Sequence, residues 1–205
     1  MSSENRAPIT ESAPAPGRRL RPSDRRAEII AAARTVFLST GYDGAGLAEV
    51  AEAGNVSRGS IYRYFPNGRS DLFQAVAESL VEELHGQMRY AARMPFSAAT
   101  RMEHLVAAVF AFFQQNPEAY RLLFRDVWAA NDPAVAANAM AAKALLTSEI
   151  ASVIADGGAE PDQLAAASAG ILGFTLATVE LAIGGELDLE TAWLTTCRYA
   201  TSQIA

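Results

Sequence analysis

Residues 55–65, NVSRGSIYRYF, place two arginines, two tyrosines and two serines on about two helical turns. An arginine guanidinium can bind phosphate oxygens or make a bidentate contact with the edge of a guanine base. Serine and tyrosine hydroxyls can bind phosphate oxygens, which positions a protein on a duplex without reading its sequence. A buried helix would not be this polar, and an ordinary solvated helix would rarely carry so many aromatic side chains. The chemistry favours a surface that contacts DNA.

Two short helices joined by a tight turn are predicted to position these side chains. The first is expected at about Leu47–Ala53 and the second at about Arg58–Tyr64, with Ser57 as its N-cap. Gly54-Asn55 forms the turn between them, because both residue types tolerate the left-handed conformation. With a longer helix before them, they form a helix-turn-helix, whose second short helix enters the DNA major groove.

The candidate DNA-contacting residues lie on this second short helix, just after it, and in an arginine cluster near the N-terminus. Gly59 lets the backbone approach the duplex, whereas Ile61 and Phe65 are expected to anchor the helix on a small core. Taken alone, Arg58 or Ser60 fits an ordinary solvated helix better, but the complete segment favours DNA. The candidates are Ser57, Arg58, Gly59, Ser60, Tyr62, Arg63, Tyr64 and Arg69, with Arg18, Arg19 and Arg21 in the N-terminal cluster.

The distribution of charge indicates a local basic surface on an acidic protein. The chain of 205 residues has a net charge of −6, yet residues 1–70 hold ten arginines against seven acidic residues. Residues 71–205 hold seven Lys and Arg against sixteen acidic residues. Such a chain is expected to present one local basic patch to nucleic acid rather than a wholly cationic surface.

The remaining segments predict helices and no strands, so the expected fold class is all-α with nine helices in two domains. Ser23 caps a first helix that ends at Gly41. Later helices are expected at about 69–93, 98–115, from 117, 133–157, 161–184 and from 188. The expected domains are a disordered basic arm over 1–22, a helix-turn-helix domain over 23–68 and a second helical domain over 69–205.

Other classes of protein find little support in the sequence. No apolar run approaches the roughly 20 residues of a membrane span, and no signal peptide is visible. The single cysteine, Cys197, fits a buried position in a protein of the reducing cytoplasm. His85 and His104 lack metal-ligand spacing, and no nucleophile elbow, P-loop or dinucleotide fingerprint occurs. We therefore expect no enzyme, no catalytic residue, no metal and no cofactor, and a cytoplasmic protein without a membrane partner.

A longer stretch around the two short helices resembles a known family. Residues 27–73, AEIIAAARTVFLSTGYDGAGLAEVAEAGNVSRGSIYRYFPNGRSDLF, are similar to the N-terminal DNA-binding domain of TetR/AcrR-type transcriptional regulators. Beyond it, only the length and the all-helical layout are similar. Arg69 stands where the family usually has a phosphate-contacting lysine. The residues that match the recognition-helix signature are Val56, Ser57, Gly59, Tyr62, Tyr64 and Phe65.

Three positions depart from the family pattern. Ala45-Gly46 replaces the usual hydroxyl pair before the first short helix, so a side-chain cap and a phosphate contact are absent. Gly54-Asn55 replaces the usual Ala-Gly, which requires Asn55 to take a positive φ. Gly68 lengthens the loop before the fourth helix by one residue. None of them breaks the motif.

The resemblance implies that the C-terminal helices form a homodimer and enclose a pocket for a small-molecule effector. The sequence independently offers an aromatic stripe at i, i+4 and i+8 on one expected short helix, with further apolar residues before and after it. Core packing is the alternative explanation for each of these side chains. The candidate ligand-binding residues are Phe112, Phe113, Tyr120, Phe124, Trp128 and Met140.

A line of small residues along 161–184 suggests a dimer interface. Small side chains on one stripe let two helix backbones approach closely. Glu180, beside this stripe, could be a charge at the rim, a hydrogen-bond partner in the interface or a polar group in the pocket. The candidate interface residues are Gly170, Gly173, Ala177, Glu180 and Trp193.

Together these patterns predict a homodimeric, ligand-responsive DNA-binding transcriptional regulator. We favour a repressor that is released from a palindromic, double-stranded operator by a small apolar or amphipathic effector. The alternative is a helical small-molecule-binding protein whose DNA-binding heads are vestigial.

Overall fold

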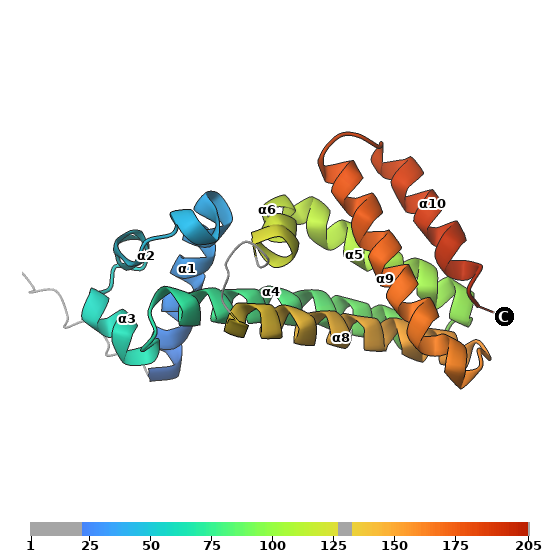
Figure 1. Cartoon of the computed structure of the whole chain (residues 1–205), viewed down its shortest axis with the longest axis horizontal. Helices are drawn as coiled ribbons and strands as arrows, with labels where there is room; N and C mark the ends of the chain where they lie inside the picture. The colour runs from blue at the N-terminus through green and yellow to red at the C-terminus, as the bar shows by residue number, and fades with distance from the viewer. Residues whose placement is uncertain (1–21, 127–132, 205) are drawn as a thin grey trace, which may run out of the picture.

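The computed structural model describes residues 22–126 and 133–204, and every regular element within them is helical. The N-terminal head contains α1 (Pro22–Gly44), α2 (Leu47–Ala53) and α3 (Arg58–Tyr64), and α4 (Arg69–Ala92) leads from it along the molecule (Figure 1). The other elements are α5 (Ala98–Gln115), α6 (Pro117–Arg121), the π-helical turn η1 (Leu122–Asp126), α8 (Pro133–Asp156), α9 (Pro161–Ile183) and α10 (Leu189–Thr201). The predicted all-α class with nine α-helices is confirmed for these residues.

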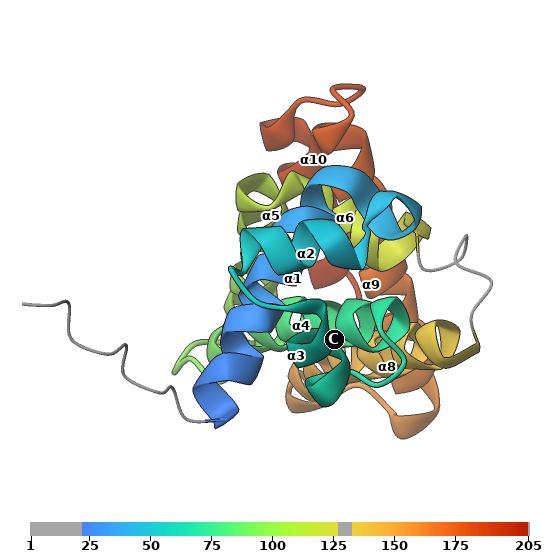
Figure 2. The same cartoon turned by 90° about the vertical axis from the view of Figure 1, so that its left-hand side faces the viewer.

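The head lies at one end of an elongated molecule, and the helical domain makes up the rest. Figure 2 looks onto the head, with α2 and α3 in front and the other helices behind. In the helical domain α4 and α8 run side by side, and α9 and α10 form a neighbouring antiparallel pair (Figure 1). The arm that was expected over 1–22, with Arg18, Arg19 and Arg21, lies outside the described residues except for Pro22.

Local sequence signals fix several helix ends. Ser57 Oγ accepts a hydrogen bond from the Ser60 amide at 3.1 Å, and Asp188 Oδ1 accepts one from the Thr191 amide at 2.9 Å. Both are side-chain N-caps, and the cap at Ser57 was predicted from the sequence. The expected helix end at Gly41 is a kink, where Gly41 takes φ 75°, and helical structure resumes as far as Gly44.

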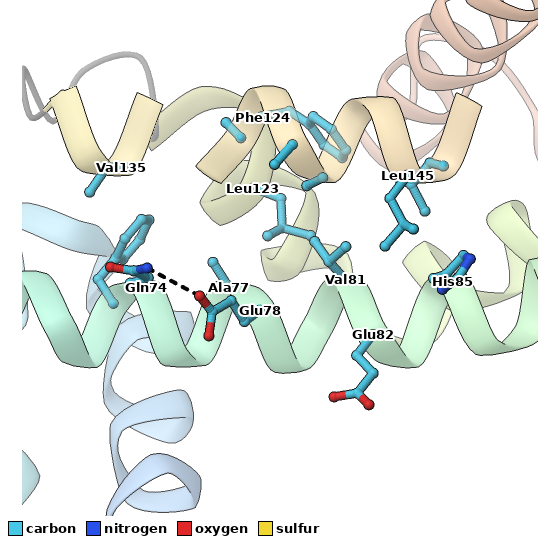
Figure 3. Close-up of a pocket in the computed structure, with 15 residues that line it drawn as sticks. Gln74, Ala77, Glu78, Val81, Glu82, His85, Leu123, Phe124, Val135 and Leu145 are labelled. Carbon is cyan, nitrogen blue, oxygen red and sulfur yellow. Dashed lines mark hydrogen bonds between the residues drawn. The ribbon is translucent and has the colours of Figure 1, made fainter. Parts of the chain in front are cut away.

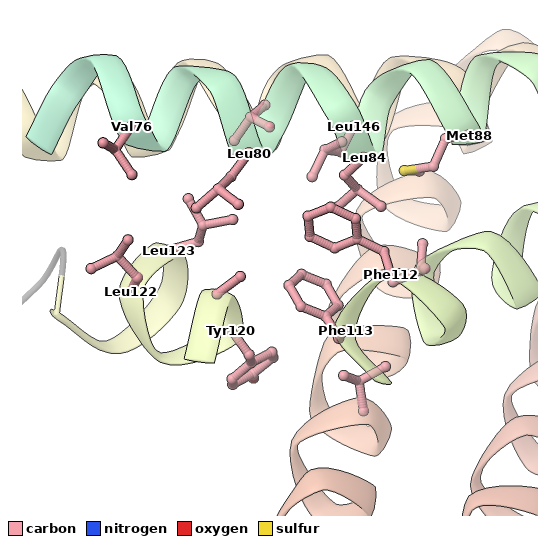
Figure 4. Close-up of a cluster of buried hydrophobic side chains, with 14 of the residues drawn as sticks. Val76, Leu80, Leu84, Met88, Phe112, Phe113, Tyr120, Leu122, Leu123 and Leu146 are labelled. Carbon is pink, nitrogen blue, oxygen red and sulfur yellow. The ribbon is translucent and has the colours of Figure 1, made fainter. Parts of the chain in front are cut away.

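The core of the helical domain is a layer of apolar side chains between α4 and its neighbours. Leu80, Leu84 and Met88 on α4 are fully buried and point toward Phe112 and Phe113 of α5 (Figure 4). The two phenylalanine rings meet edge to face with centroids 5.0 Å apart. This layer packs α4 against the rest of the domain.

The aromatic stripe predicted on one short helix is interrupted. The α-helix that begins at Pro117 ends at Arg121, and the π-helical turn η1 follows. A π-turn advances more residues per turn than an α-helix, so an i, i+4, i+8 pattern no longer lies on one line. Tyr120 and Phe124 still touch, with ring centroids 5.4 Å apart, whereas Trp128 lies outside the described residues.

α9 departs from the expectation that no segment could span a membrane. Its 23 residues are long and apolar enough to do so by length and composition alone. Within the structure α9 packs between α8 and α10, and the buried hydroxyls of Thr178 and Thr196 lie 2.7 Å apart across the α9–α10 contact. A helix in such a bundle passes the same compositional test, so no membrane is indicated.

Candidate nucleic-acid interface and ligand cavity

α3 has one buried face and one exposed polar face. Ile61 is fully buried and Phe65, which follows the helix, is 2% exposed, so these two side chains hold α3 on the head. Tyr62 is 51% exposed, and Arg58 and Arg63 are also exposed. The sequence prediction that Ile61 and Phe65 anchor this helix is confirmed.

The positions that depart from the family pattern, Asn55 in the turn and Gly46 before α2, have the conformations that were expected from the sequence. Asn55 takes φ 46°, and it is the non-glycine residue with positive φ among those described. Gly46 caps α2 without a side-chain hydrogen bond, so the cap that a hydroxyl would provide is absent. A Cβ on Gly59 would meet only Ser57 Oγ at 3.8 Å, which leaves this backbone open to an approaching molecule.

Two arginines of the head, and Arg69 at the start of α4, lie over aromatic rings. The Arg69 guanidinium lies 4.7 Å from the Tyr42 ring centroid, and Arg69 Nη1 donates to the Asp43 carbonyl at 3.2 Å. Arg63 lies 6.0 Å from the Tyr64 centroid. Arg26, which sequence reasoning did not single out, lies 5.2 Å from the ring of Phe65. These contacts pre-position cationic groups near α3.

A cavity of about 540 Å³ opens between α4, η1 and α8 (Figure 3). Its walls are mainly apolar, and its polar side chains come from α4. The lining residues are Phe73, Gln74, Ala77, Glu78, Val81, Glu82, His85, Leu123, Phe124, Val135, Ala139, Ala141, Ala142, Leu145 and Leu146. The volume and the apolar lining are those of a small-molecule site.

The structure separates the residues that were expected to bind a ligand. Phe124 lines the cavity, whereas Phe112, Phe113 and Tyr120 lie in the adjoining core (Figure 4). Met140 is 66% exposed and lines a shallow groove on α8 outside this cavity.

Sequence reasoning missed the α4 wall of the cavity. Gln74, Ala77, Val81 and His85 lie at i, i+3, i+7 and i+11 on one face of α4. This spacing, on a face of α4 beside the buried leucines, is the sequence pattern from which the cavity wall could have been predicted. At one end of the cavity His85 Nε2 lies 2.7 Å from Glu149 Oε1, which links α4 to α8. His85, which was expected to be an ordinary surface or core residue, therefore lines the cavity.

The cavity and the head share a side chain. Phe73 lines the cavity, and its ring meets those of Phe37 and Tyr42 edge to face, with centroids 5.5 and 4.7 Å away. Arg69 is stacked on the same Tyr42 ring. A movement of the Phe73 ring would therefore be passed through the Tyr42 ring to Arg69.

Polar contacts join the head to the helical domain at two further points. Arg34 of α1 binds Glu83 of α4 at 3.0 Å and the side-chain oxygen of Asn116 at 3.3 Å. Arg121 of α6 donates to the Leu38 carbonyl at 3.1 Å. The head thus contacts both α4 and the α5–α6 corner.

Glu180 makes its contacts within the chain. One carboxylate oxygen accepts a hydrogen bond from the Tyr120 hydroxyl at 3.0 Å, and the other pairs with Arg125. Burial and this hydrogen bond together raise the pKa of Tyr120. Glu180 does not line the cavity, and it ties α9 to α6 and η1.

The line of small residues on α9 does not face one way. A Cβ on Gly170 would come within 3.0 Å of the Tyr199 hydroxyl, so Gly170 faces α10 of the same chain. Gly173 has open space at that position, and Ala177 is exposed. Trp193 is partly buried, and its indole nitrogen has no hydrogen-bond partner among the described residues.

Comparison with known proteins places this chain among regulators. Residues 29–76 match the model of the bacterial regulatory proteins of the tetR family. The chain is 29% identical over 161 residues to the HTH-type transcriptional activator FasR of Mycolicibacterium smegmatis, covering 78% of this chain and 73% of FasR.

Solved structures share the fold. The regulator FadR of Bacillus subtilis, in complex with stearoyl-CoA, has a TM-score of 0.75 and 16% identity, covering 88% of this chain and all of that one. A tetR-family regulator of Streptomyces coelicolor has a TM-score of 0.71 and 19% identity, covering 88% of this chain and 79% of that one. These two likenesses establish the fold of the head and of the helical domain.

Proposed function

This chain belongs to the TetR family of bacterial regulatory proteins, and on that premise we propose that it is a ligand-responsive transcriptional regulator that binds operator DNA as a homodimer. The two α3 helices of the dimer enter successive major grooves of a near-palindromic operator. A small apolar or amphipathic effector occupies the cavity between α4, η1 and α8 and releases the protein from DNA. The protein therefore represses transcription while it is bound to the operator, and the effector relieves this repression.

The single observation that carries the proposal is the two-faced character of α3. Its apolar side chain Ile61 is buried, while Arg58, Tyr62 and Arg63 are exposed. Arginine supplies charge to phosphates or a bidentate fork to guanine, and the tyrosine hydroxyl binds phosphate oxygens. The proposed DNA-contacting set is Ser57, Arg58, Gly59, Ser60, Tyr62, Arg63, Tyr64 and Arg69, with Arg18, Arg19 and Arg21 preceding the described residues.

Release of the DNA follows from the position of Phe73. An effector that fills the cavity presses on Phe73, and through the Phe37 and Tyr42 rings it changes the start of α4 relative to α1. The separation of the two heads in a dimer then changes. Only a ligand with different affinities for the two head separations shifts this equilibrium.

A second copy of the chain covers the outer faces of α9 and α10. Four large apolar side chains of these two helices are exposed, Leu181, Ile183, Leu189 and Leu194, and α9 is also open at Gly173 and Ala177. An isologous four-helix interface buries them, and an obligate one exceeds roughly 2,000 Å².

Two relatives bear on the effector and on the direction of regulation. FadR of Bacillus subtilis was solved with stearoyl-CoA, and FasR is an activator. A reporter fused to the regulated promoter separates the two outcomes, because transcription rises on loss of a repressor and falls on loss of an activator.

The decisive experiment is a mobility shift with the DNA upstream of the gene that encodes this chain. We expect the wild-type protein to retard this DNA in preference to an unrelated duplex of equal length. A folded Arg58→Ala, Tyr62→Phe, Tyr64→Phe variant should lose that preference. Equal binding of both duplexes by the wild-type protein would instead support the small-molecule-binding alternative with vestigial heads.

A further inference from the structure

The charge on the cavity walls limits which effector can enter. The polar lining residues are Gln74, Glu78, Glu82 and His85, and among the described residues no lysine or arginine lines the cavity. Gln74 Nε2 donates to Glu78 Oε1 at 3.1 Å along the α4 side (Figure 3). The cavity is therefore apolar inside and acidic along one edge.

The surrounding sequence supplies no lysine or arginine that could offset this acidity, and His85 is paired with Glu149 at 2.7 Å. Residues 70–88 of α4 contain no lysine or arginine, and residues 127–132 contain neither of these nor histidine. Lys143, the basic residue of α8, lines the groove on another face, and Arg125 of η1 is paired with Glu180. An anionic headgroup at this cavity would meet the carboxylates of Glu78 and Glu82 and, in the lining that the structure describes, no lysine or arginine.

The cavity wall also contains aromatic rings. Phe73 and Phe124 line the cavity, and the face of an aromatic ring attracts a cation within about 6 Å of its centre. In Figure 3 the Glu82 side chain points away from α8. It is exposed, and exposed side chains change rotamer within nanoseconds, so its charge can follow a bound cation.

We propose that the effector is a lipophilic cation, an apolar body that carries one ammonium group. The apolar body lies against Val81, Leu123 and Leu145, and the ammonium group lies at the α4 edge beside Glu78 and Glu82. This inference rests on the proposed function for its effect on DNA, but not for binding itself. It sets this chain apart from the regulator solved with stearoyl-CoA, whose ligand carries anionic phosphates.

Calorimetry on the DNA-free, full-length protein tests the inference with three probes of equal chain length: decyltrimethylammonium, decanol and decanoate. At low salt we expect the cation to bind roughly tenfold more tightly than the anion. A Glu78→Gln, Glu82→Gln variant should lose roughly three- to tenfold in affinity for the cation and bind decanol unchanged. The unchanged decanol affinity shows that the cavity of the variant is intact.

A matched control removes two carboxylates that do not line the cavity. Glu103→Gln, Glu118→Gln changes exposed residues of α5 and α6 and should leave the affinity for all three probes unaltered. The inference is overturned if decanoate or stearoyl-CoA binds as tightly as the cation, or if the Glu78, Glu82 variant binds the cation like wild type. Cation binding that leaves operator binding unchanged would support this inference and count against the proposed function.

Discussion

At the residue scale, the proposed DNA surface includes two cationic groups, Arg63 and Arg69, that lie over aromatic rings before DNA arrives. Arg63 rests on Tyr64, and Arg69 rests on Tyr42 while donating to a carbonyl. A stacked guanidinium loses less conformational freedom when it binds phosphate than a free side chain does. If this surface binds DNA as proposed, Tyr42 and Tyr64 would contribute to affinity by positioning these arginines as well as through any hydroxyl contact.

Replacing Arg58 or Arg63 by alanine should weaken operator binding, because each removes an exposed charge of α3. Loss of a residue that contacts phosphate should lower the salt dependence of log K by about one unit, and loss of one that reads a base should cost about 1–3 kcal/mol at a single base pair. Fluorescence anisotropy over a salt series measures both effects. Arg89→Ala, an exposed position far along α4, is the control. Wild-type affinity in both α3 variants would exclude these residues from the interface.

At the element scale, the parts of the fold that depend on local signals could be predicted and those that depend on packing could not. The bounds of α2 and α3 follow from the Ser57 cap and the Gly54-Asn55 turn, so they were predicted correctly. The π-turn after Arg121 has no such local signal. The α4 wall of the cavity depends on which face of α4 turns toward α8, and the candidate ligand residues were therefore sought on the aromatic helix instead.

Two glycines in long helices should respond in opposite ways to alanine. Gly41 takes φ 75° at the kink of α1, so a Cβ there is strained, and Gly41→Ala should destabilise the protein by more than about 1 kcal/mol. Gly86 lies within α4, where an added Cβ would meet no described atom within 4 Å, and Gly86→Ala should stabilise by about 0.5–1 kcal/mol. Urea unfolding measures both. Equal shifts of the same sign would contradict this account of the kink.

Phe73 should transmit the effector signal more than it holds the effector. Phe73→Leu keeps an apolar wall in the cavity but removes the ring that meets Phe37 and Tyr42. We expect the variant to bind a ligand with similar affinity and to need several-fold more of it to release DNA. Calorimetry and anisotropy titrations on the same protein separate the two quantities. A proportional loss of both would place Phe73 in ligand binding alone.

At the scale of the whole molecule, the head lies at one end and the exposed apolar residues of α9 and α10 lie in the helical domain (Figure 1). Pairing through α9 and α10 would bring two heads to one DNA duplex. The dimer would therefore form through α9 and α10, which do not line the cavity between α4, η1 and α8.

The open part of the α9 stripe should be where two chains meet. Gly173→Leu, Ala177→Leu adds bulk on the outer face and, if that face is an interface, costs about 1–3 kcal/mol per site in each subunit. Sedimentation at micromolar concentration should show dissociation, with loss of operator affinity. Gly170→Leu is an informative contrast, because its side chain would meet Tyr199 within the chain and reduce stability instead. A double variant that stays dimeric with normal DNA binding would move the interface elsewhere.

The central claim is that this chain recognises a specific DNA sequence as a dimer. The most direct measurement is the affinity of the wild-type protein for its operator and for a scrambled duplex of equal composition, at physiological salt. We expect the operator to bind at least about 10³-fold more tightly than the scrambled duplex, with two chains per duplex. Equal affinity for both duplexes, or one chain per operator at saturation, would contradict it.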